Sequence, residues 1–392
     1  MTAPLKVLQV GAFPFPSPQG SQVLLGGTAR ALASLGHEVR VACYHHGVGD
    51  DRGLTVHRAP RVPGYARTRS GPDLVKPGLD LLLAQTVRRV AQAHRVDVVH
   101  AHNHEALLAC ALGLACAFGL GGLSRRPALV YGEHTLLAEE LPTYFSFGLR
   151  GWSRLGRALD GALPLAADGA VALSARGAVG LGTRVKGPVE VIPPGIDPED
   201  FAGVCPRRAG PGKWLVFAGT PDRFQDADLL VPAIRGLRGW RLLLVGAGWE
   251  PIARLNPEVV HVAGGWLEAR DWIAGADVAA LPRRVCAGFP LKLLNYAALG
   301  LRTVVSEGSA RGVPGEKIVS GAGTIGDRTA EFIDAVHSVA DLARLDGATV
   351  QRDWSWHGRA LQLEAFYRRV LSDPAGAAAR RNSVTSRTQD AY

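Results

Sequence analysis

Short apolar segments recur along the first half of the chain, and segments with a helical spacing of apolar residues separate them. The apolar segments lie at 6–10, 37–43, 54–58, 97–101, 128–131, 169–173 and 189–192, and the helical ones at 22–35, 79–94, 106–123 and 155–166. Strands that alternate with helices in this way predict a parallel, doubly wound sheet.

The same alternation restarts in the second half of the chain, after Pro/Gly-rich loops at 193–197 and 205–212. Its expected strands lie at 215–219, 242–246, 259–262, 278–281 and 303–305, with a helix at 270–274. We expect an N-terminal Rossmann-like domain over 1–197 and a C-terminal one over 198–355. A helix over 356–372 should pack back toward the N-terminal domain, and the tail over 373–392 should be disordered. The predicted fold class is α/β, with two Rossmann-like domains facing across a cleft and ligands at the carboxyl ends of both sheets.

Composition narrows the choice of partners. Of 392 residues, 47% are hydrophobic and 20% are charged, which is typical of a globular protein. The net charge of +9 comes almost entirely from arginine and suits nucleotide phosphates or an acidic membrane surface. No run of basic and aromatic residues resembles a nucleic-acid module. Five scattered cysteines without a CxxC motif indicate small buried side chains in a reducing compartment, and hence a cytoplasmic location.

Two apolar stretches resemble segments that enter membranes, namely a signal peptide and a membrane-spanning helix. The first strand is too short for the core of a signal peptide. Residues 106–123 carry no charge and approach the length of a membrane span, but they follow a strand inside a βα pattern, so we expect a buried helix. Two basic amphipathic surfaces are candidates for peripheral contact with the inner face of an anionic membrane. The first is formed by Arg88 and Arg89 with the leucines at 79, 81, 82 and 83, and the second is 145–159 with Arg150, Arg154 and Arg157. The alternative is that their apolar sides belong to the core.

The segment from Cys286 to Gly300 combines a loop, a helix and a following strand. Pro290 suits a first helical position, and Gly300 suits a left-handed C-cap. Lys292 in the first turn, together with unpaired amides and the helix dipole, would form a phosphate site, with Asn295 one turn deeper offering an amide to a hydroxyl. An ordinary amphipathic helix with a solvated lysine is an equally good interpretation of this segment taken alone.

An ordered set of motifs resembles a known family. "GHEVRV", "DVVHAH", "VIPPGIDPEDF", "FAG", "LLLVGAG", "GADVAALP" and "GFPLKLLNYAALG" occur in the order found in GT-B glycosyltransferases of the family-4 type, over nearly the whole chain. These are retaining enzymes that use nucleotide-sugar donors. The resemblance implies a hexosyltransferase acting in cell-envelope polysaccharide biosynthesis, with a UDP- or GDP-linked donor and a glycan or lipid-linked acceptor.

The resemblance also assigns roles to residues. It places Gly20 and Ser21 beside the diphosphate and His134 against the transferred sugar. It places the remaining donor contacts at Gly219, Arg223, Gly246, Gly288, Phe289, Pro290, Leu291 and Asn295, and the acceptor side at His102, Asn103 and His104. The catalytic residues expected are His134 and Lys292.

The sequence departs from the family pattern at the usual pair of glutamates, which would fall on Ala287 and Asn295. A neutral Asn295 can bond hydroxyls without charge assistance, and Ala287 cannot bond them at all. Arg223 is the nearest candidate for the family's arginine, and Lys292 would replace the missing cation. Lys292, the helix start at 289–291 and the Gly20–Ser21 amides would neutralise the leaving diphosphate. With these groups we expect neither a metal nor a cofactor.

Other functions compete with this one. His100, His102 and His104 alternate at a strand end, as in the metal sites of zinc hydrolases, but His134 is the only other obvious ligand. Gly246-Ala247-Gly248 is a weak hint of a nicotinamide site, because no third glycine follows. The missing glutamates support a non-catalytic nucleotide-sugar binder, and a GT-B epimerase is a further option.

Overall fold

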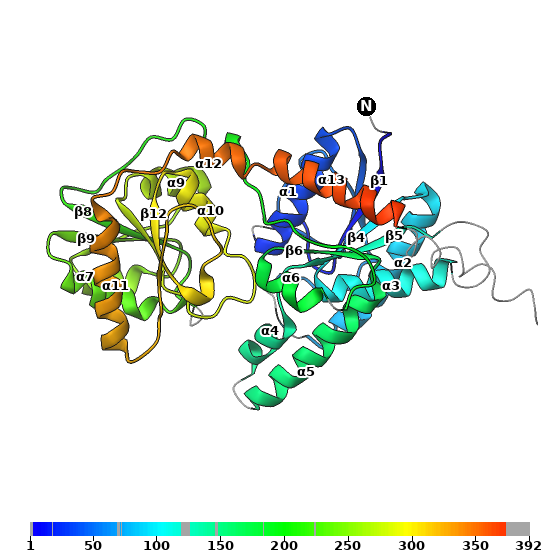
Figure 1. The fold of residues 1–392 in the computed structure, drawn as a ribbon, viewed down its shortest axis with the longest axis horizontal. Coiled ribbons are helices and arrows are strands. Elements are labelled where there is room, and N and C mark those ends of the chain that lie inside the picture. The colour runs from blue at the N-terminus through cyan, green and yellow to red at the C-terminus, as the bar shows by residue number, and fades with distance from the viewer. Residues whose placement is uncertain are drawn as a thin grey trace, which may run out of the picture. The chain divides into compact units, whose positions relative to one another are not determined.

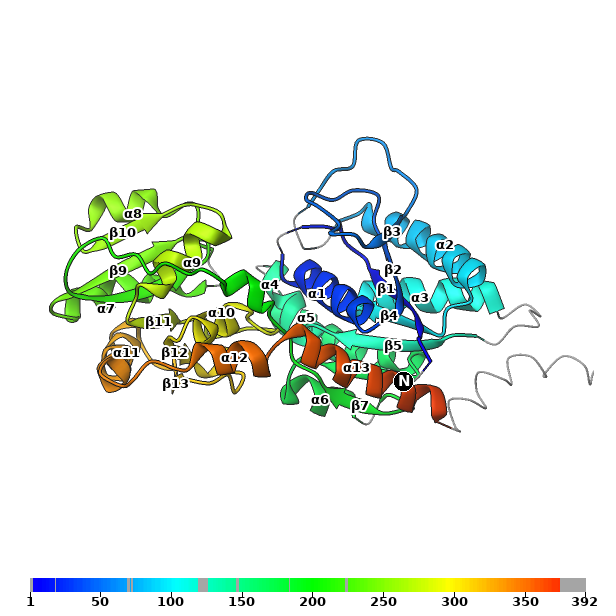
Figure 2. The same ribbon diagram turned by 90° about the horizontal axis from the view of Figure 1, so that it is seen from above.

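A computed structural model of the chain describes residues 3–17, 19–68, 71, 73–118, 126–145, 148–182, 184–222 and 225–373. The chain divides into two compact units, the first made of Met1–Gly195 with Trp356–Tyr392 and the second of Ile196–Ser355. Arg223 and nearly all of the expected tail lie outside the described residues. Figures 1 and 2 show the elements of each unit in two views.

Unit 1 is built on a seven-stranded parallel sheet in the order β3-β2-β1-β4-β5-β6-β7. Its strands are β1 (Lys6–Gly11), β2 (Glu38–Cys43), β3 (Thr55–Arg58), β4 (Val98–His102), β5 (Ala128–Glu133), β6 (Gly169–Ala172) and β7 (Val189–Val191). Its helices are α1 (Gly20–Ser34), α2 (Lys76–His94), α3 (Asn103–Phe118), α4 (Leu137–Tyr144), α5 (Leu149–Ala162), α6 (Ala175–Leu181) and α13 (Trp356–Ser372).

The alternation of side chains along the strands separates two cores in unit 1. Leu8 and Val10 of β1 pack with α2 and α3, whereas Val7 packs with α1 and α13. Gln9 is completely buried on the same side of β1 as Val7. A polar side chain therefore enters the core between the sheet and the pair α1/α13.

Unit 2 is built on a six-stranded parallel sheet in the order β10-β9-β8-β11-β12-β13. Its strands are β8 (Lys213–Ala218), β9 (Trp240–Val245), β10 (Val259–Val262), β11 (Val278–Leu281), β12 (Arg302–Ser306) and β13 (Glu316–Val319). Its helices are α7 (Leu230–Gly236), α8 (Glu250–Leu255), α9 (Trp266–Ala274), α10 (Lys292–Ala298), α11 (Ile325–Ala340) and α12 (Gly347–Asp353). The predicted α/β class with two Rossmann-like domains is confirmed.

Several local expectations change. The helix expected to start at Pro290 begins at Lys292, because the residues before it form a turn; Gly300 does take the left-handed conformation, with φ +81°. Cys43, Cys110 and Cys286 are buried as expected, but Cys116 and Cys205 are exposed. In the described part of the chain, no helix combines the length and the apolar character that crossing a bilayer requires.

Candidate active site

The carboxyl ends of β1, β4 and β5 meet at one edge of the unit 1 sheet. The strand register pairs Gly11 with His102 and His102 with Gly132. His102 is the last residue of β4, and His134 follows the end of β5 directly. Ser21 lies in the first turn of α1, after Gly20, which is exposed and opens the helix. The sheet topology thus brings together three segments that are far apart in the sequence.

Hydrogen bonds join six side chains at this edge into one chain. Ser21 Oγ lies 3.1 Å from His134 Nδ1, and His134 Nε2 lies 3.0 Å from His102 Nδ1. His102 Nε2 lies 2.5 Å from Gln9 Oε1. Gln9 Nε2 donates to the Tyr367 hydroxyl at 3.1 Å, and Tyr367 reaches His100 Nδ1 at 2.7 Å. Both ring nitrogens of His134 are therefore engaged within the protein.

The histidines of this chain are held neutral. His100, His102 and His134 expose 3%, 1% and 4% of their surface. Burial lowers the pKa of His100 to about 3. Burial is also the main cause that lowers the pKa of His134 to about 3 and that of His102 well below its usual range. Near neutral pH these imidazoles can orient protons but carry no charge.

The residues expected on the acceptor side behave differently from one another. Asn103 has a left-handed backbone (φ +73°), and its buried Oδ1 has no hydrogen-bond partner among the described residues. His104 turns away, with Nδ1 3.4 Å from the Tyr131 hydroxyl and Nε2 3.6 Å from Glu140. Burial opposes the charge on both members of this pair, yet the pKa of His104 is raised and that of Glu140 is lowered to about 2 because each stabilises the other.

The same arrangement weighs against the zinc interpretation. The rings of His100 and His102 stack with centroids 4.6 Å apart, while both nitrogens of His104 face Tyr131 and Glu140. Within the described ranges, no three His, Cys, Asp or Glu side chains are grouped as ligands of one ion. The alternating histidines thus serve two separate hydrogen-bond networks.

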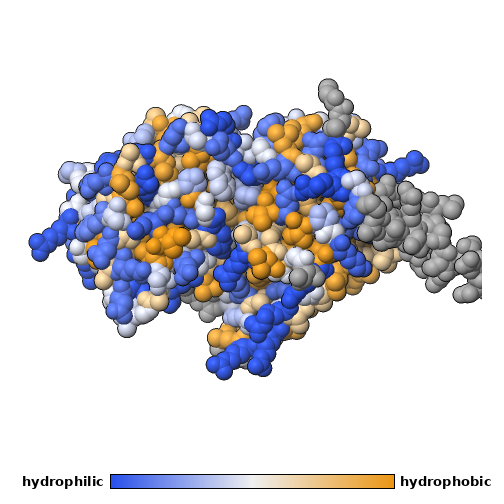
Figure 3. Space-filling view, in the orientation of Figure 1, coloured by the Kyte–Doolittle hydropathy of each residue, from blue (hydrophilic) through white to orange (hydrophobic). Residues whose placement is uncertain are grey.

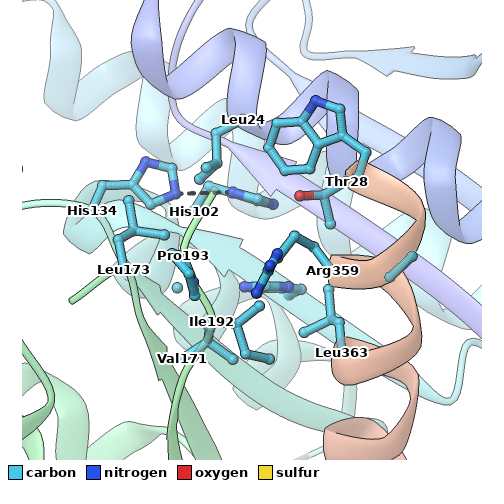
Figure 4. A pocket seen from close by; sticks show the side chains of 14 residues that line it. Leu24, Thr28, His102, His134, Val171, Leu173, Ile192, Pro193, Arg359 and Leu363 are labelled. Atoms are coloured by element: carbon cyan, nitrogen blue, oxygen red, sulfur yellow. Dashed lines mark hydrogen bonds between the residues drawn. The ribbon is translucent and has the colours of Figure 1, made fainter. Parts of the chain in front are cut away.

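A small cavity lies on the inner side of the network, between the sheet, α1 and α13. Figure 4 shows His134 bonded to His102 at its wall and Arg359 reaching into it from α13. Its volume of about 30 Å³ has room for one or two water molecules, not for a sugar. We therefore separate this cavity from the substrate site.

Unit 2 places Lys292 at the carboxyl edge of its own sheet. The ammonium group lies 4.6 Å from the centre of the Phe217 ring and 3.2 Å from Gln225 Oε1. Burial, with the charge of Arg283, lowers the pKa of Lys292 to about 8. Among the residues that the structure describes, no carboxylate lies within ion-pair distance of Lys292. A cation without a counter-ion can accept an anionic ligand.

Two glycines shape the space around this lysine. Gly219 follows β8 with φ +149°, and a Cβ there would lie 2.8 Å from Lys292 Nζ. The Gly219 carbonyl accepts a bond from Trp249 Nε1 at 2.7 Å. Gly246 follows β9 with φ +129°, and a Cβ there would meet the Gly219 carbonyl oxygen at 2.4 Å. Both positions therefore require glycine for close approach of the two loops.

The loop before α10 is tied down by a residue that we did not predict. The Arg311 guanidinium donates to the carbonyls of Cys286 and Gly288 at 2.7 Å each, and also bonds Gly308 and Ala310. This clamp fixes the entry to the helix that carries Lys292.

The other expected donor residues follow the clamped loop. The Phe289 ring lies 6.4 Å from that of Trp354, and Pro290 is buried. The carbonyls of Pro290 and Leu291 accept the amides of Leu293 and Leu294. Asn295 is half-buried, and within the described ranges its side chain makes no hydrogen bond.

Gln9, Tyr367, Gln225 and Arg311 were not predicted. Gln9 carries a signal, because it is the one polar residue inside the apolar run Val7–Val10. The other three have no local signal, since each comes from a distant part of the chain.

Comparisons with known proteins agree with the fold. The profile of Glycosyltransferase Family 4 matches residues 18–200, and that of glycosyl transferases group 1 matches residues 212–341. No curated protein gives a significant sequence match.

Three solved structures illustrate the structural likeness. Sucrose-phosphate synthase from Thermosynechococcus elongatus is 16% identical, with TM-score 0.73 over 93% of this chain and 98% of its own. HepE from Anabaena, in complex with UDP and glucose, is 15% identical, with TM-score 0.63 over 92% and 99%. The catalytic domain of starch synthase IV from Arabidopsis thaliana, bound to ADP and acarbose, is 14% identical, with TM-score 0.65 over 95% and 100%. Glycosyltransferase profiles thus match a large part of each half of the chain, and the chain has the GT-B fold.

Proposed function

We propose that the protein transfers a hexose from a UDP- or GDP-linked donor, with retention, to a lipid-linked or polysaccharide acceptor. In this proposal unit 2 binds the nucleotide sugar and unit 1 binds the acceptor. Support for the donor class comes from structural relatives of the same fold that hold UDP with glucose, or ADP. We assign a cytoplasmic location, where nucleotide sugars are supplied.

The observation that carries the proposal is the environment of Lys292. Its side chain is partly buried at the end of β8, its ammonium group contacts a neutral amide and an aromatic ring, and its pKa is lowered. A diphosphate beside it would supply the missing counter-charge. As the bond from the anomeric carbon to the phosphate breaks, negative charge grows on the leaving oxygen, and Lys292 would stabilise that charge.

The edge of unit 1 supplies the polar groups for the rest of the reaction. We propose that Ser21, backed by His134, and Asn103 face the transferred sugar and the acceptor. Asn103 supports this role because its buried Oδ1 is an acceptor without a partner among the described residues. No protein nucleophile is assigned.

The first experiment is a binding and turnover screen of the full chain. UDP, GDP, ADP and their hexose conjugates would be tested by thermal shift, because a bound ligand raises the apparent stability by mass action. Slow hydrolysis of each stabilising donor would then be followed. Lys292→Ala should lose about 1.5–3 kcal/mol of diphosphate binding, whereas Lys317→Ala, on the exposed side of β13, should lose none.

The outcomes separate the alternatives. Donor hydrolysis or transfer supports the glycosyltransferase. Binding without turnover would favour a non-catalytic nucleotide-sugar binder, for which Ala287 and Asn295 at the positions of the family's glutamates are the argument. Isomerised sugar in the absence of any acceptor would indicate an epimerase. Equal diphosphate affinity in wild type and Lys292→Ala would remove Lys292 from the site.

A further inference from the structure

The side-chain network of unit 1 has a direction, and Gln9 sets it. The Gln9 side chain turns its Oε1, an acceptor, toward His102 Nε2 at 2.5 Å and its Nε2, a donor, toward the Tyr367 hydroxyl at 3.1 Å. His102 Nε2 therefore carries a proton that it donates to Gln9. Because His102 is neutral, its Nδ1 is an acceptor.

This assignment propagates toward the protein surface. His102 Nδ1 must receive its hydrogen bond from His134, so His134 carries its proton on Nε2. The remaining nitrogen, His134 Nδ1, is then an acceptor, and the Ser21 hydroxyl donates to it. The Ser21 hydroxyl thus donates its only proton to His134. Toward a ligand, its oxygen can then only accept hydrogen bonds.

The inner half of the chain runs in a compatible sense. Gln9 Nε2 donates to Tyr367, and Tyr367 donates to His100 Nδ1. His100 then carries its proton on Nε2, and this buried atom, at the cavity wall, has no partner among the described residues. The orientation of the Gln9 amide thus fixes the direction of every bond in the chain, and the opposite orientation would reverse them all.

We propose that Gln9 is a positioning residue that orients Ser21 as a hydrogen-bond acceptor, so that this position binds a substrate hydroxyl group and not a phosphate oxygen. A phosphate oxygen needs a donor, which the Ser21 side chain no longer offers. The hydroxyl can belong to the donor sugar or to the acceptor glycan. This inference rests on the proposed glycosyl transfer and refines it at one position.

The polarity can be tested without any substrate. In the ¹⁵N-histidine-labelled full chain, long-range ¹H–¹⁵N spectra distinguish the two neutral tautomers, and single His→Asn variants assign the signals. We expect the Nε2–H tautomer at His100, His102 and His134. The Nδ1–H tautomer at His134 would overturn the proposal, because Ser21 would then be the acceptor in that bond and free to donate outward. Gln9→Met should mix the tautomers of His134, whereas Gln22→Met, at a buried glutamine of α1 bonded to Gln19, should not.

The ligand class is tested with Ser21→Ala and matched probes. UDP with UDP-glucose, GDP with GDP-mannose and ADP with ADP-glucose are the pairs, used where the wild type binds them. We expect the affinity for the diphosphate to change less than twofold. A loss of about tenfold, the effect of one hydrogen bond, should appear either in nucleotide-sugar affinity, which assigns the hydroxyl to the donor, or only in the acceptor KM, which assigns it to the acceptor.

Ser34→Ala is the control, because Ser34 lies at the other end of α1 and its hydroxyl donates to the Ala31 carbonyl of its own helix. Equal losses for diphosphate and nucleotide sugar in Ser21→Ala would show a phosphate contact and overturn the proposal, as would no loss in any arm. A wild type that binds no donor at all would contradict the proposed function instead, while the tautomer spectra still decide the polarity of Ser21.

Discussion

Lys292 carries a charge that is sensitive to pH in the range where the enzyme would be assayed. Burial lowers its pKa to about 8, and a bound diphosphate favours the protonated form. Diphosphate affinity should therefore be constant below about pH 8 and fall by up to about tenfold per pH unit above it. Titration calorimetry from pH 6.5 to 9.5 measures this slope.

Lys292→Arg is the matched comparison, because a guanidinium remains charged across that whole range. Its affinity should show no fall between pH 8 and 9.5. If wild type and Lys292→Arg have the same pH profile, another group controls diphosphate binding.

The three neutral histidines make the protein sensitive to acid. The folded-state pKa values of His100 and His134 are about 3, and that of His102 is also lowered, whereas the unfolded chain binds these protons near 6.5. The three histidines therefore make their full contribution to the free energy of unfolding above about pH 6.5. Below that pH the contribution falls, by up to about 1.4 kcal/mol per pH unit for each histidine. Glu140, with a pKa of about 2, adds a loss that begins near pH 4.5.

Urea unfolding between pH 4 and 7.5 checks this expectation. His100→Asn keeps an acceptor near Tyr367 but cannot titrate. In this variant the free energy of unfolding should therefore change less steeply with pH, by the slope that corresponds to about one bound proton. An identical slope in the variant would mean that His100 is already protonated in the folded state.

Candidate site residues could be predicted from the sequence, but their hydrogen-bond partners could not. The histidine-rich strand end, Lys292 and the glycine loops were predicted as candidate positions because their residue types are informative on their own. The partners Gln9 and Tyr367 are 358 positions apart, and only the packing of α13 against the sheet brings them together. The direction of a hydrogen-bond network depends on such partners, so no spacing rule could reveal it.

At the level of elements, the interior strands were predictable because both faces of a parallel sheet are buried and their sequences are apolar throughout. The edge strand β13 (EKIV) was missed because it is short, half charged and partly exposed. The long helix α11 was also missed, although Thr324 and Asp327 form a capping box at its start, a signal that the sequence does contain.

The amphipathic helix α5 carries an exposed basic surface. Arg150, Arg154 and Arg157 are exposed one turn apart, beside the exposed Leu155, and Figure 3 shows hydrophilic and apolar surface adjoining over α5. We expect binding to vesicles that contain phosphatidylglycerol at low salt and release at high salt, because screening weakens the attraction. Vesicle sedimentation measures both.

Helix α2 provides the control for this prediction. Leu79 and Leu83 are buried in the core, so two of the four leucines of that expected surface are not available. Leu81, Arg88 and Arg89 are exposed. Replacing the three arginines of α5 with glutamine should abolish sedimentation, and replacing Arg88 and Arg89 should leave most of it. Equal losses would indicate a general charge effect without a specific surface.

At the level of the molecule, unit 1 is completed by α13, which comes from beyond unit 2 in the sequence. Phe366, Tyr367 and Val370 are completely buried against the sheet and α1. Phe366→Ala should lower the unfolding free energy of unit 1 by about 3–5 kcal/mol. The exposed Leu361 on the same helix is the control, and Leu361→Ala should cost under about 0.5 kcal/mol.

Hydrogen exchange followed peptide by peptide distinguishes the two units. Protection should fall in β1, β4 and β5 of the Phe366→Ala variant and remain in β8, β9 and β11. A parallel loss in unit 2 would show that the units unfold as one body.

The late position of α13 also matters during synthesis. Residues 1–195 emerge first, and all of Ile196–Ser355 must be translated before α13 exists. Until then the face of the unit 1 sheet that carries Val7, Val98 and Val130 lacks the part of its cover that α13 supplies. At roughly 5–20 residues per second, the 160 intervening residues take on the order of ten to thirty seconds. For that interval the nascent chain presents an apolar surface suited to a ribosome-associated chaperone, and unit 2 should be the first part of the molecule to become native.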